Sequence, residues 1–187
     1  MPEHISNIVQ EATDAFRGVL GLVVGDREAP HRFNLSNEGL VGSLIALLLI
    51  TGISDYLPVL LGHPGAMFRS FTSDTVLTAL QWGCSALVLR QVGRFDGFVP
   101  YLIADNWATV FITIAITTLQ LMGAGGDVLS LAVIVLLLVV AVNIGRLVVG
   151  LPALQVATLI IAQLTGAAIG MLAVGILFPI PPGALAQ

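Results

Sequence analysis

Long apolar segments, separated by short polar turns, run through most of this chain of 187 residues. The pattern predicts five long helices, at about 40–61, 73–92, 98–122, 128–149 and 153–178. Each is close to the length of about 20 apolar residues with which a helix crosses a bilayer. Turn and capping residues separate them, as at Thr72-Ser73-Asp74 and at Gly150-Leu151-Pro152. We therefore expect an all-α polytopic membrane helix bundle with five transmembrane helices.

The segment before these helices, residues 5–23, has a different pattern. Its apolar residues follow the helical spacing from Ile5 to Val23, and its other face carries polar side chains such as Glu11 and Arg17. A helix of this kind lies in the membrane interface, docks on other helices or binds a partner. We expect an N-terminal amphipathic interfacial helix and a polar connector over 1–39, a transmembrane domain over 40–180 and a short external tail over 181–187.

Composition agrees with a membrane location. The chain is 57% hydrophobic and only 10% charged, whereas soluble domains carry about 25% charged residues. A single cysteine, Cys84, leaves no intrachain disulfide and no cysteine-based metal site, and the sequence contains no basic cluster for nucleic acid. We expect no cofactor and no nucleic-acid partner. The expected partners are the lipid bilayer and, further, other membrane proteins or a second copy of the chain.

The basic residues predict an orientation. All 7 are arginines, and cytoplasmic segments of membrane proteins are enriched in such residues. With the N-terminus inside, the outer side holds only Arg69, and the cytoplasmic side holds Arg17, Arg27, Arg32, Arg90, Arg94 and Arg146. Exclusive use of arginine is also typical of GC-rich bacterial genomes. We therefore expect a multi-pass protein of the bacterial inner membrane, with a cytoplasmic N-terminus and an external, periplasmic C-terminus.

Polar residues within the predicted helices are candidates for a functional site, because a charge in the hydrocarbon costs about 2.5–3.5 kcal/mol on insertion scales. The sequence places five of them near the cytoplasmic ends: Arg90, Asp105, Asn106, Asn143 and Arg146. One interpretation is a cluster that binds an anionic headgroup or substrate, or gates a path. In the other, the arginines extend to the interface and Asp105 pairs with one of them to fix helix packing.

Two further features fall inside the predicted helices. Asp55, towards the outer end of 40–61, is either a proton or cation site or marks the end of the span, with Tyr56 at the interface. Gly166 and Gly170 form a small-xxx-small face that permits close approach of a helix from the same bundle or from a second protomer. Five further polar residues are expected to hydrogen-bond between helices: Gln81, Gln120, Gln155, Gln163 and Thr165.

An internal repeat is a further hypothesis. Residues 76–124 align without gaps on residues 128–176, and the alignment pairs Gly93-Arg94 with Gly145-Arg146 and Pro100 with Pro152. Two helical hairpins of the same orientation would explain these matches, as in the parallel repeats of transporters. The alternative is chance, because biased apolar composition produces matches of this kind.

The layout of a cytosolic N-terminal segment, five spans and an external C-terminus resembles that of Yip1-like membrane proteins. The stretch Phe98-Val-Pro-Tyr-Leu-Ile-Ala-Asp-Asn-Trp107 also resembles a helix of small bacterial polytopic membrane proteins. The resemblance implies a non-enzymatic role in membrane organisation, or as an accessory or assembly subunit of a membrane complex. The alternative is a small transporter or channel that uses Asp55 and Asp105, the latter with Arg90 and Arg146. An enzyme is not expected, because the sequence contains no catalytic motif.

Overall fold

The computed structural model describes residues 2–60 and 67–178, and this part of the chain contains helices and no strand. Six α-helices follow one another: α1 (Pro2–Val24), α2 (Asn37–Leu60), α3 (Met67–Gln91), α4 (Phe98–Leu121), α5 (Asp127–Asn143) and α6 (Ala153–Leu177). The shorter elements are the 3-10 turns η1 (Ala29–Arg32) and η2 (Phe95–Gly97) and the π-helical segment η3 (Ile144–Val148). The prediction of an all-α protein is confirmed. The predicted tail, 181–187, lies outside the described residues.

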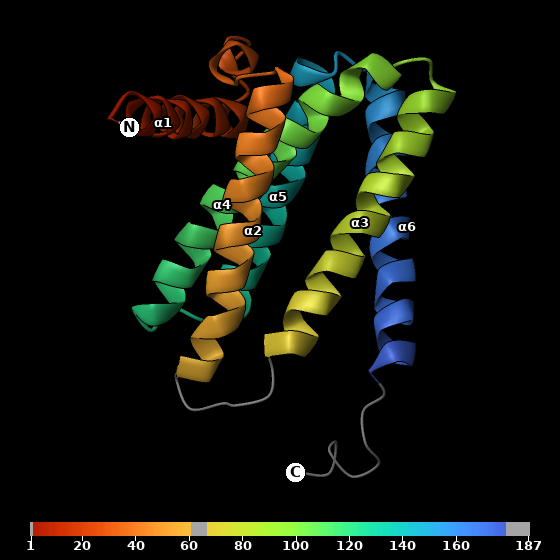
Figure 1. The fold of residues 1–187 in the computed structure, drawn as a ribbon. Coiled ribbons are helices and arrows are strands. Elements are labelled where there is room, and N and C mark those ends of the chain that lie inside the picture. The colour runs from red at the N-terminus through yellow and green to blue at the C-terminus, as the bar shows by residue number, and fades with distance from the viewer. Residues whose placement is uncertain (1, 61–66, 179–187) are drawn as a thin grey trace.

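Within the described residues, four segments are long and apolar enough to cross a membrane: Asn37–Leu57, Phe95–Leu121, Asp127–Val148 and Ala153–Leu177. They correspond to α2, α4, α5 with η3, and α6. Helix α3 is not among them, because its first turns carry Arg69, Asp74 and several hydroxyl side chains. It is nevertheless 25 residues long, the same length as α6, and it lies alongside α6 (Figure 1).

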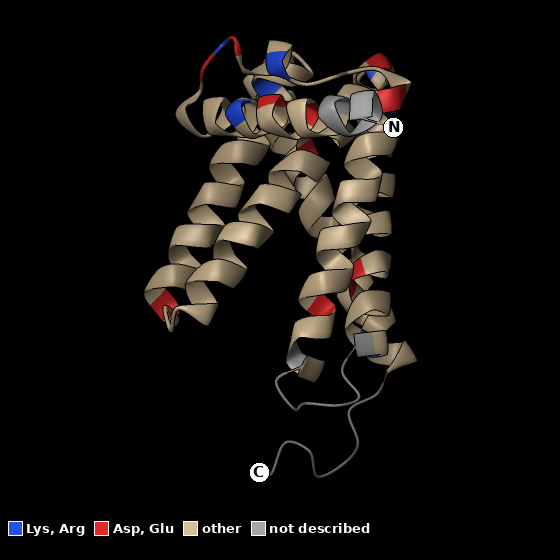
Figure 2. Ribbon diagram, turned by 60° about the vertical axis from the view of Figure 1, so that its left-hand side comes forward, with Lys and Arg blue, Asp and Glu red and all other residues tan. Residues whose placement is uncertain are grey.

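Helices α2 to α6 lie roughly along one axis, some running up and others down, whereas α1 lies across one end of them (Figure 1). The closest pairs are α3 with α6 and α2 with α4. The helices spread apart towards the end opposite α1 (Figures 1 and 2). Most of the buried core lies at the α1 end and is centred on the first half of α4, where Tyr101, Ile103, Ala104, Trp107 and Ala108 are buried.

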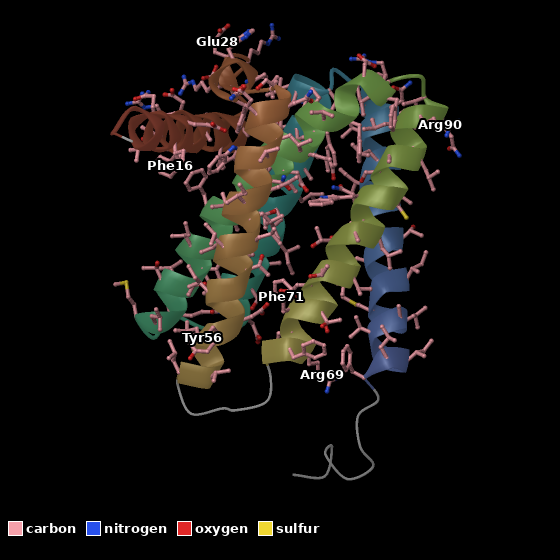
Figure 3. All side chains as sticks on the ribbon, in the orientation of Figure 1. Phe16, Glu28, Tyr56, Arg69, Phe71 and Arg90 are labelled. Carbon is pink, nitrogen blue, oxygen red and sulfur yellow. The ribbon has the colours of Figure 1, made fainter. Side chains whose placement is uncertain are left out.

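Two apolar stripes explain the position of α1. One stripe, which includes Ala15, Val19 and Leu22, is buried against the rest of the protein. The other stays largely exposed and includes Ile8, Val9, Phe16 and Leu20. Figure 3 shows Phe16 on the side of α1 that faces the long helices, and its ring meets that of Phe111 in α4 edge-on, with 5.2 Å between centroids. Only part of the apolar face predicted from the sequence is therefore used for packing.

Candidate functional site

The arginines gather at the end of the molecule that carries α1 (Figure 2). They come from α1, η1, the last turn of α3, the turn before η2, and η3. Figure 3 shows Arg69 and Arg90 at opposite ends of α3. One end of the described structure is thus rich in basic side chains, and the other end has Arg69.

Of the five polar residues predicted to cluster, two lie on α4 and bond to neighbouring helices. Asp105 Oδ2 accepts a hydrogen bond from Trp82 Nε1 of α3 at 3.4 Å. Asn106 is fully buried, and its Nδ2 donates to Ser43 Oγ of α2 at 3.0 Å. Both residues therefore connect α4 to another helix.

The other three residues of the predicted cluster lie elsewhere. Asn143 Nδ2 donates to the Leu22 carbonyl at 2.7 Å and so ties α5 to the end of α1. Arg90 and Arg146 are exposed. Within residues 2–60 and 67–178, no hydrogen bond or ion pair joins any two of the five predicted residues.

A tyrosine hydroxyl is the main polar junction inside the bundle. Tyr101 Oη of α4 accepts hydrogen bonds from Gln163 Nε2 of α6 at 2.6 Å and from Ser85 Oγ of α3 at 3.3 Å. The interhelical role expected for Gln163 is therefore observed. Tyr101 was not singled out from the sequence, because nothing local distinguishes a buried hydroxyl from one at the membrane interface.

Asp55 points into the protein, whereas the neighbouring Tyr56 is exposed. Asp55 Oδ2 and Ser54 Oγ are buried and have no hydrogen-bond partner among the described residues. Asp74 of α3 lies close enough for its carboxylate to repel that of Asp55. The two acids from α2 and α3 therefore form a second polar region. Of the two, only Asp55 is identified as a candidate site residue from the sequence.

Asp74 was expected to help cap a helix that begins near residue 73, but α3 already begins at Met67. The hydroxyls of Ser73 and Thr75 donate to the carbonyls of Arg69 and Phe71, at 2.7 Å in both cases. They satisfy carbonyls of the preceding turn instead of capping free N–H groups, so the helix continues through them.

Gly166 and Gly170 face α3. A Cβ atom on Gly166 would lie 2.8 Å from the Gln81 Cα, and one on Gly170 would lie 3.1 Å from the Leu77 Cα. The helix that approaches the small-xxx-small face is therefore α3 of the same chain.

The two Gly-Arg pairs matched by the internal repeat have different roles. Gly93 turns the chain with a φ of +71°, and Arg94 then donates to the carbonyls of Val149 and Gly150, the latter at 3.2 Å. Gly145, in contrast, is buried within η3, where a Cβ would lie 3.1 Å from Val156. Near the second Gly-Arg pair it is Gly150, not Gly145, that has a positive φ, of +73°.

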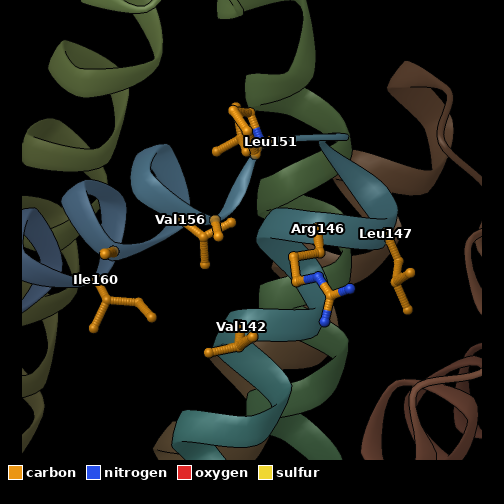
Figure 4. A pocket seen from close by; sticks show the side chains of 9 residues that line it. Val142, Arg146, Leu147, Leu151, Val156 and Ile160 are labelled. Atoms are coloured by element: carbon orange, nitrogen blue, oxygen red, sulfur yellow. The ribbon is translucent and has the colours of Figure 1, made fainter.

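A pocket of about 620 Å³ opens between η3 and the start of α6. Among the described residues that line it, Arg146 is the only charged one, and the others are apolar: Val142, Leu147, Leu151, Pro152, Ala153, Val156, Ala157 and Ile160. Figure 4 shows Val142, Arg146 and Leu147 on one side, Val156 and Ile160 on the other, and Leu151 in the turn between them. The sequence singled out Arg146 but gave no signal for the π-helical segment that carries it.

Comparison of the chain with protein-family models, with curated proteins and with solved structures found no match.

Proposed function

We propose that this protein is a non-enzymatic integral membrane protein that organises the membrane or serves as an accessory or assembly subunit of a membrane complex. The observation that supports this role is the use of polar groups inside the long helices. Trp82 with Asp105, Ser43 with Asn106, and Tyr101 with its two partners all bond helix to helix. Polar groups used in this way hold a bundle together.

The proposal includes five spans, with α3 as the fifth. Its 25 residues match the length of α6, and the glycine face of α6 lies against its backbone. Close packing of this kind allows a moderately polar helix to lie in a bundle, although Asp74 and Thr75 in its first turns are exposed. Arg69 and the hydroxyl residues of the first turns would then lie near the outer surface.

The proposed orientation follows from the arginines. Their concentration at the α1 end favours a cytoplasmic N-terminus in a bacterial inner membrane and an external C-terminus. In this orientation α1 lies in the cytoplasmic interface, and its exposed stripe around Phe16 contacts lipid. Membership of a Yip1-like family would be consistent with this layout and stays a prediction.

The alternative function is a small transporter or channel. It is favoured by Asp55, whose Oδ2 is buried without a hydrogen-bond partner among the described residues, with Ser54 and Asp74 nearby. Buried acids of this kind bind protons or cations in many transporters. Asp105 contributes less to this alternative, because Trp82 already donates to its carboxylate.

Two substitutions separate these functions. A packing role predicts that Asp105→Asn lowers thermal stability and membrane accumulation. It also predicts that proteoliposomes with the Asp55→Asn variant show the same proton flux, measured with a pH-sensitive dye, as empty vesicles. Asp127→Asn, at the exposed start of α5, is the matched control. A wild-type flux above that of empty vesicles, abolished by Asp55→Asn in a normally folded protein, would favour the transporter.

Purification in a mild detergent tests the accessory role directly. The proposal predicts that the protein elutes in a stoichiometric complex with another membrane protein. Elution of the protein alone, together with the flux described above, would contradict it.

A further inference from the structure

The pocket beside Arg146 lies at the arginine-rich end of the long helices, and the inference drawn from it rests on the proposed membrane orientation. Its walls come from the end of α5, from η3 and from the first two turns of α6. Because α5 with η3 and α6 are both long and apolar enough to span a bilayer, their junction lies at the depth of the lipid headgroups. The pocket volume, about 620 Å³, is far more than a single phosphate group requires.

The charge of Arg146 is available to a ligand. Three other arginines at this end, Arg17, Arg32 and Arg94, each form an ion pair with a nearby carboxylate, whereas Arg146 has none within the described part of the chain. Its side chain extends along the wall of the pocket towards Val142 (Figure 4). A guanidinium in this position offers several N–H donors to phosphate oxygens.

The start of α6 adds a second favourable element. Pro152 occupies the N-cap position, and no side chain caps the helix. The first N–H groups of a helix have no partner within it, and they carry the positive end of the helix dipole. Pro152 and Ala153 both line the pocket, so this helix end opens towards the same space as Arg146.

The π-helical segment brings these elements together. Val149 N donates to the carbonyl of Ile144, five residues earlier, and Leu151 N donates to that of Gly145. Gly145 allows Val156 to approach closely, since a Cβ there would lie 3.1 Å from the valine side chain. The wider turn places Arg146 on the pocket wall. Local π-helical turns are frequent at functional sites.

We propose that this pocket binds an anionic phospholipid of the cytoplasmic leaflet. Its phosphate would lie between Arg146 and the start of α6, and an acyl chain would run along the apolar wall of Val142, Val156 and Ile160. The apolar lining distinguishes this ligand from a free phosphate ion, which would leave most of the pocket unfilled. Charge complementarity distinguishes it from a zwitterionic lipid, because the pocket carries one positive side chain and no carboxylate.

The test is native mass spectrometry of the purified full-length protein in detergent, titrated with phosphatidylglycerol or phosphatidylcholine. We expect wild-type protein to retain phosphatidylglycerol preferentially. Arg146→Gln should weaken that preference about fivefold, the factor that corresponds to about 1 kcal/mol for one basic residue near anionic headgroups. Arg90→Gln, an exposed arginine at the same end and outside the pocket, should leave the preference unchanged.

A second variant tests the pocket itself and keeps every charge. Ala157 lines the pocket and is exposed, so Ala157→Phe should fill it without disturbing the core. Retention of phosphatidylglycerol should fall in this variant, even if Arg146→Gln fails to fold. Equal retention of the two lipids by wild type, or an equal loss in the Arg90 and Arg146 variants, would overturn the proposal. So would saturable binding of inorganic phosphate to the lipid-free protein without any lipid preference.

Discussion

Tyr101 shows how a single side chain connects three helices. Its hydroxyl accepts hydrogen bonds from Gln163 of α6 and Ser85 of α3, while its ring lies in the core of α4. Removing the hydroxyl would leave two donors without this partner. Interhelical hydrogen bonds in membrane proteins are individually modest, with an average near 0.6 kcal/mol.

A double-mutant cycle measures this junction. We expect Tyr101→Phe and Gln163→Leu each to lower the free energy of unfolding, with a coupling of about 0.5–1.5 kcal/mol between them. The measurement is denaturant unfolding in mixed micelles. Gln120, on the exposed end of α4, provides the control, and Gln120→Leu should show no coupling to Tyr101→Phe. Strictly additive effects of Tyr101→Phe and Gln163→Leu would contradict the observed bond.

The glycine face of α6 gives a second prediction at this scale. Gly166→Ala would place a Cβ 2.8 Å from the backbone of α3, so we expect destabilisation of about 1–3 kcal/mol from overpacking. Gly175→Ala has open space around it and should be neutral or slightly stabilising, because alanine favours helix. Thermal unfolding in detergent distinguishes the two. Equal effects would show that α3 and α6 are not packed through this face.

The sequence identified several of these residues but not all of their partners. Gln163, Gly166 and Gly170 could be predicted because their residue types imply interhelical contact. The meeting of Asp105 with Arg90 or Arg146 was inferred from similar depth alone. Depth does not fix the direction in which a side chain points around its helix, and in the structure Trp82 of α3 meets Asp105 instead.

At the scale of elements, α1 packs mainly on α4 and α5, and one of its acidic side chains lies against α2. Glu11 Oε1 is buried without a hydrogen-bond partner among the described residues, and it lies where a Cβ on Gly42 would be 3.0 Å away. Burial raises the pKa of Glu11 above its usual value of 4.5. A hydrogen bond from the Asn34 side chain opposes this shift, while the charge of Glu38 adds to it.

This pKa shift predicts that docking of α1 depends on pH. A docked Glu11 holds its proton more tightly than a solvated one, so docking is weakest when the carboxylate is charged and strengthens as pH falls through the raised pKa. We expect the midpoint of thermal unfolding to rise as the pH is lowered from neutrality towards 5. Glu11→Gln should raise the midpoint at neutral pH and make the rise smaller.

The partly exposed Asp14 on the same helix provides the control for this experiment. Asp14→Asn should keep the pH dependence of the wild type. A wild-type midpoint that falls over the same pH range, or a Glu11→Gln variant that retains the full rise, would show that Glu11 does not control the docking of α1.

The long helices could be predicted because they depend on local features of the sequence: the length of each apolar segment and the glycine and proline residues that separate the segments. Two features could not. The start of α3 at Met67 lies before hydroxyl residues that are good caps, but in the structure their side chains bond back within the helix. The π-helical turn at Ile144–Val148 lies where α6 packs against Gly145. This is a tertiary contact, and the local sequence does not indicate it.

At the scale of the whole molecule, the five-span proposal depends on α3. Four segments are apolar and long enough to cross a membrane without further argument. If α3 did not span, its two ends would lie on the same side of the membrane. Arg69 and Arg90 would then share one surface, and the arginine asymmetry that orients the protein would weaken.

Site-directed labelling across α3 is the most direct test of this claim. In a Cys84→Ser background, Phe68→Cys marks the first turn of α3, Asp96→Cys marks η2, which follows α3, and Asp127→Cys marks the start of α5. All three native side chains are exposed. The reagent is a membrane-impermeant maleimide applied to intact bacterial cells that express the protein, and then to permeabilised cells.

The five-span account predicts that Phe68→Cys and Asp127→Cys react in intact cells and that Asp96→Cys reacts only after permeabilisation. Reaction of Phe68→Cys and Asp96→Cys from the same side of the membrane would contradict it, because α3 would then not cross.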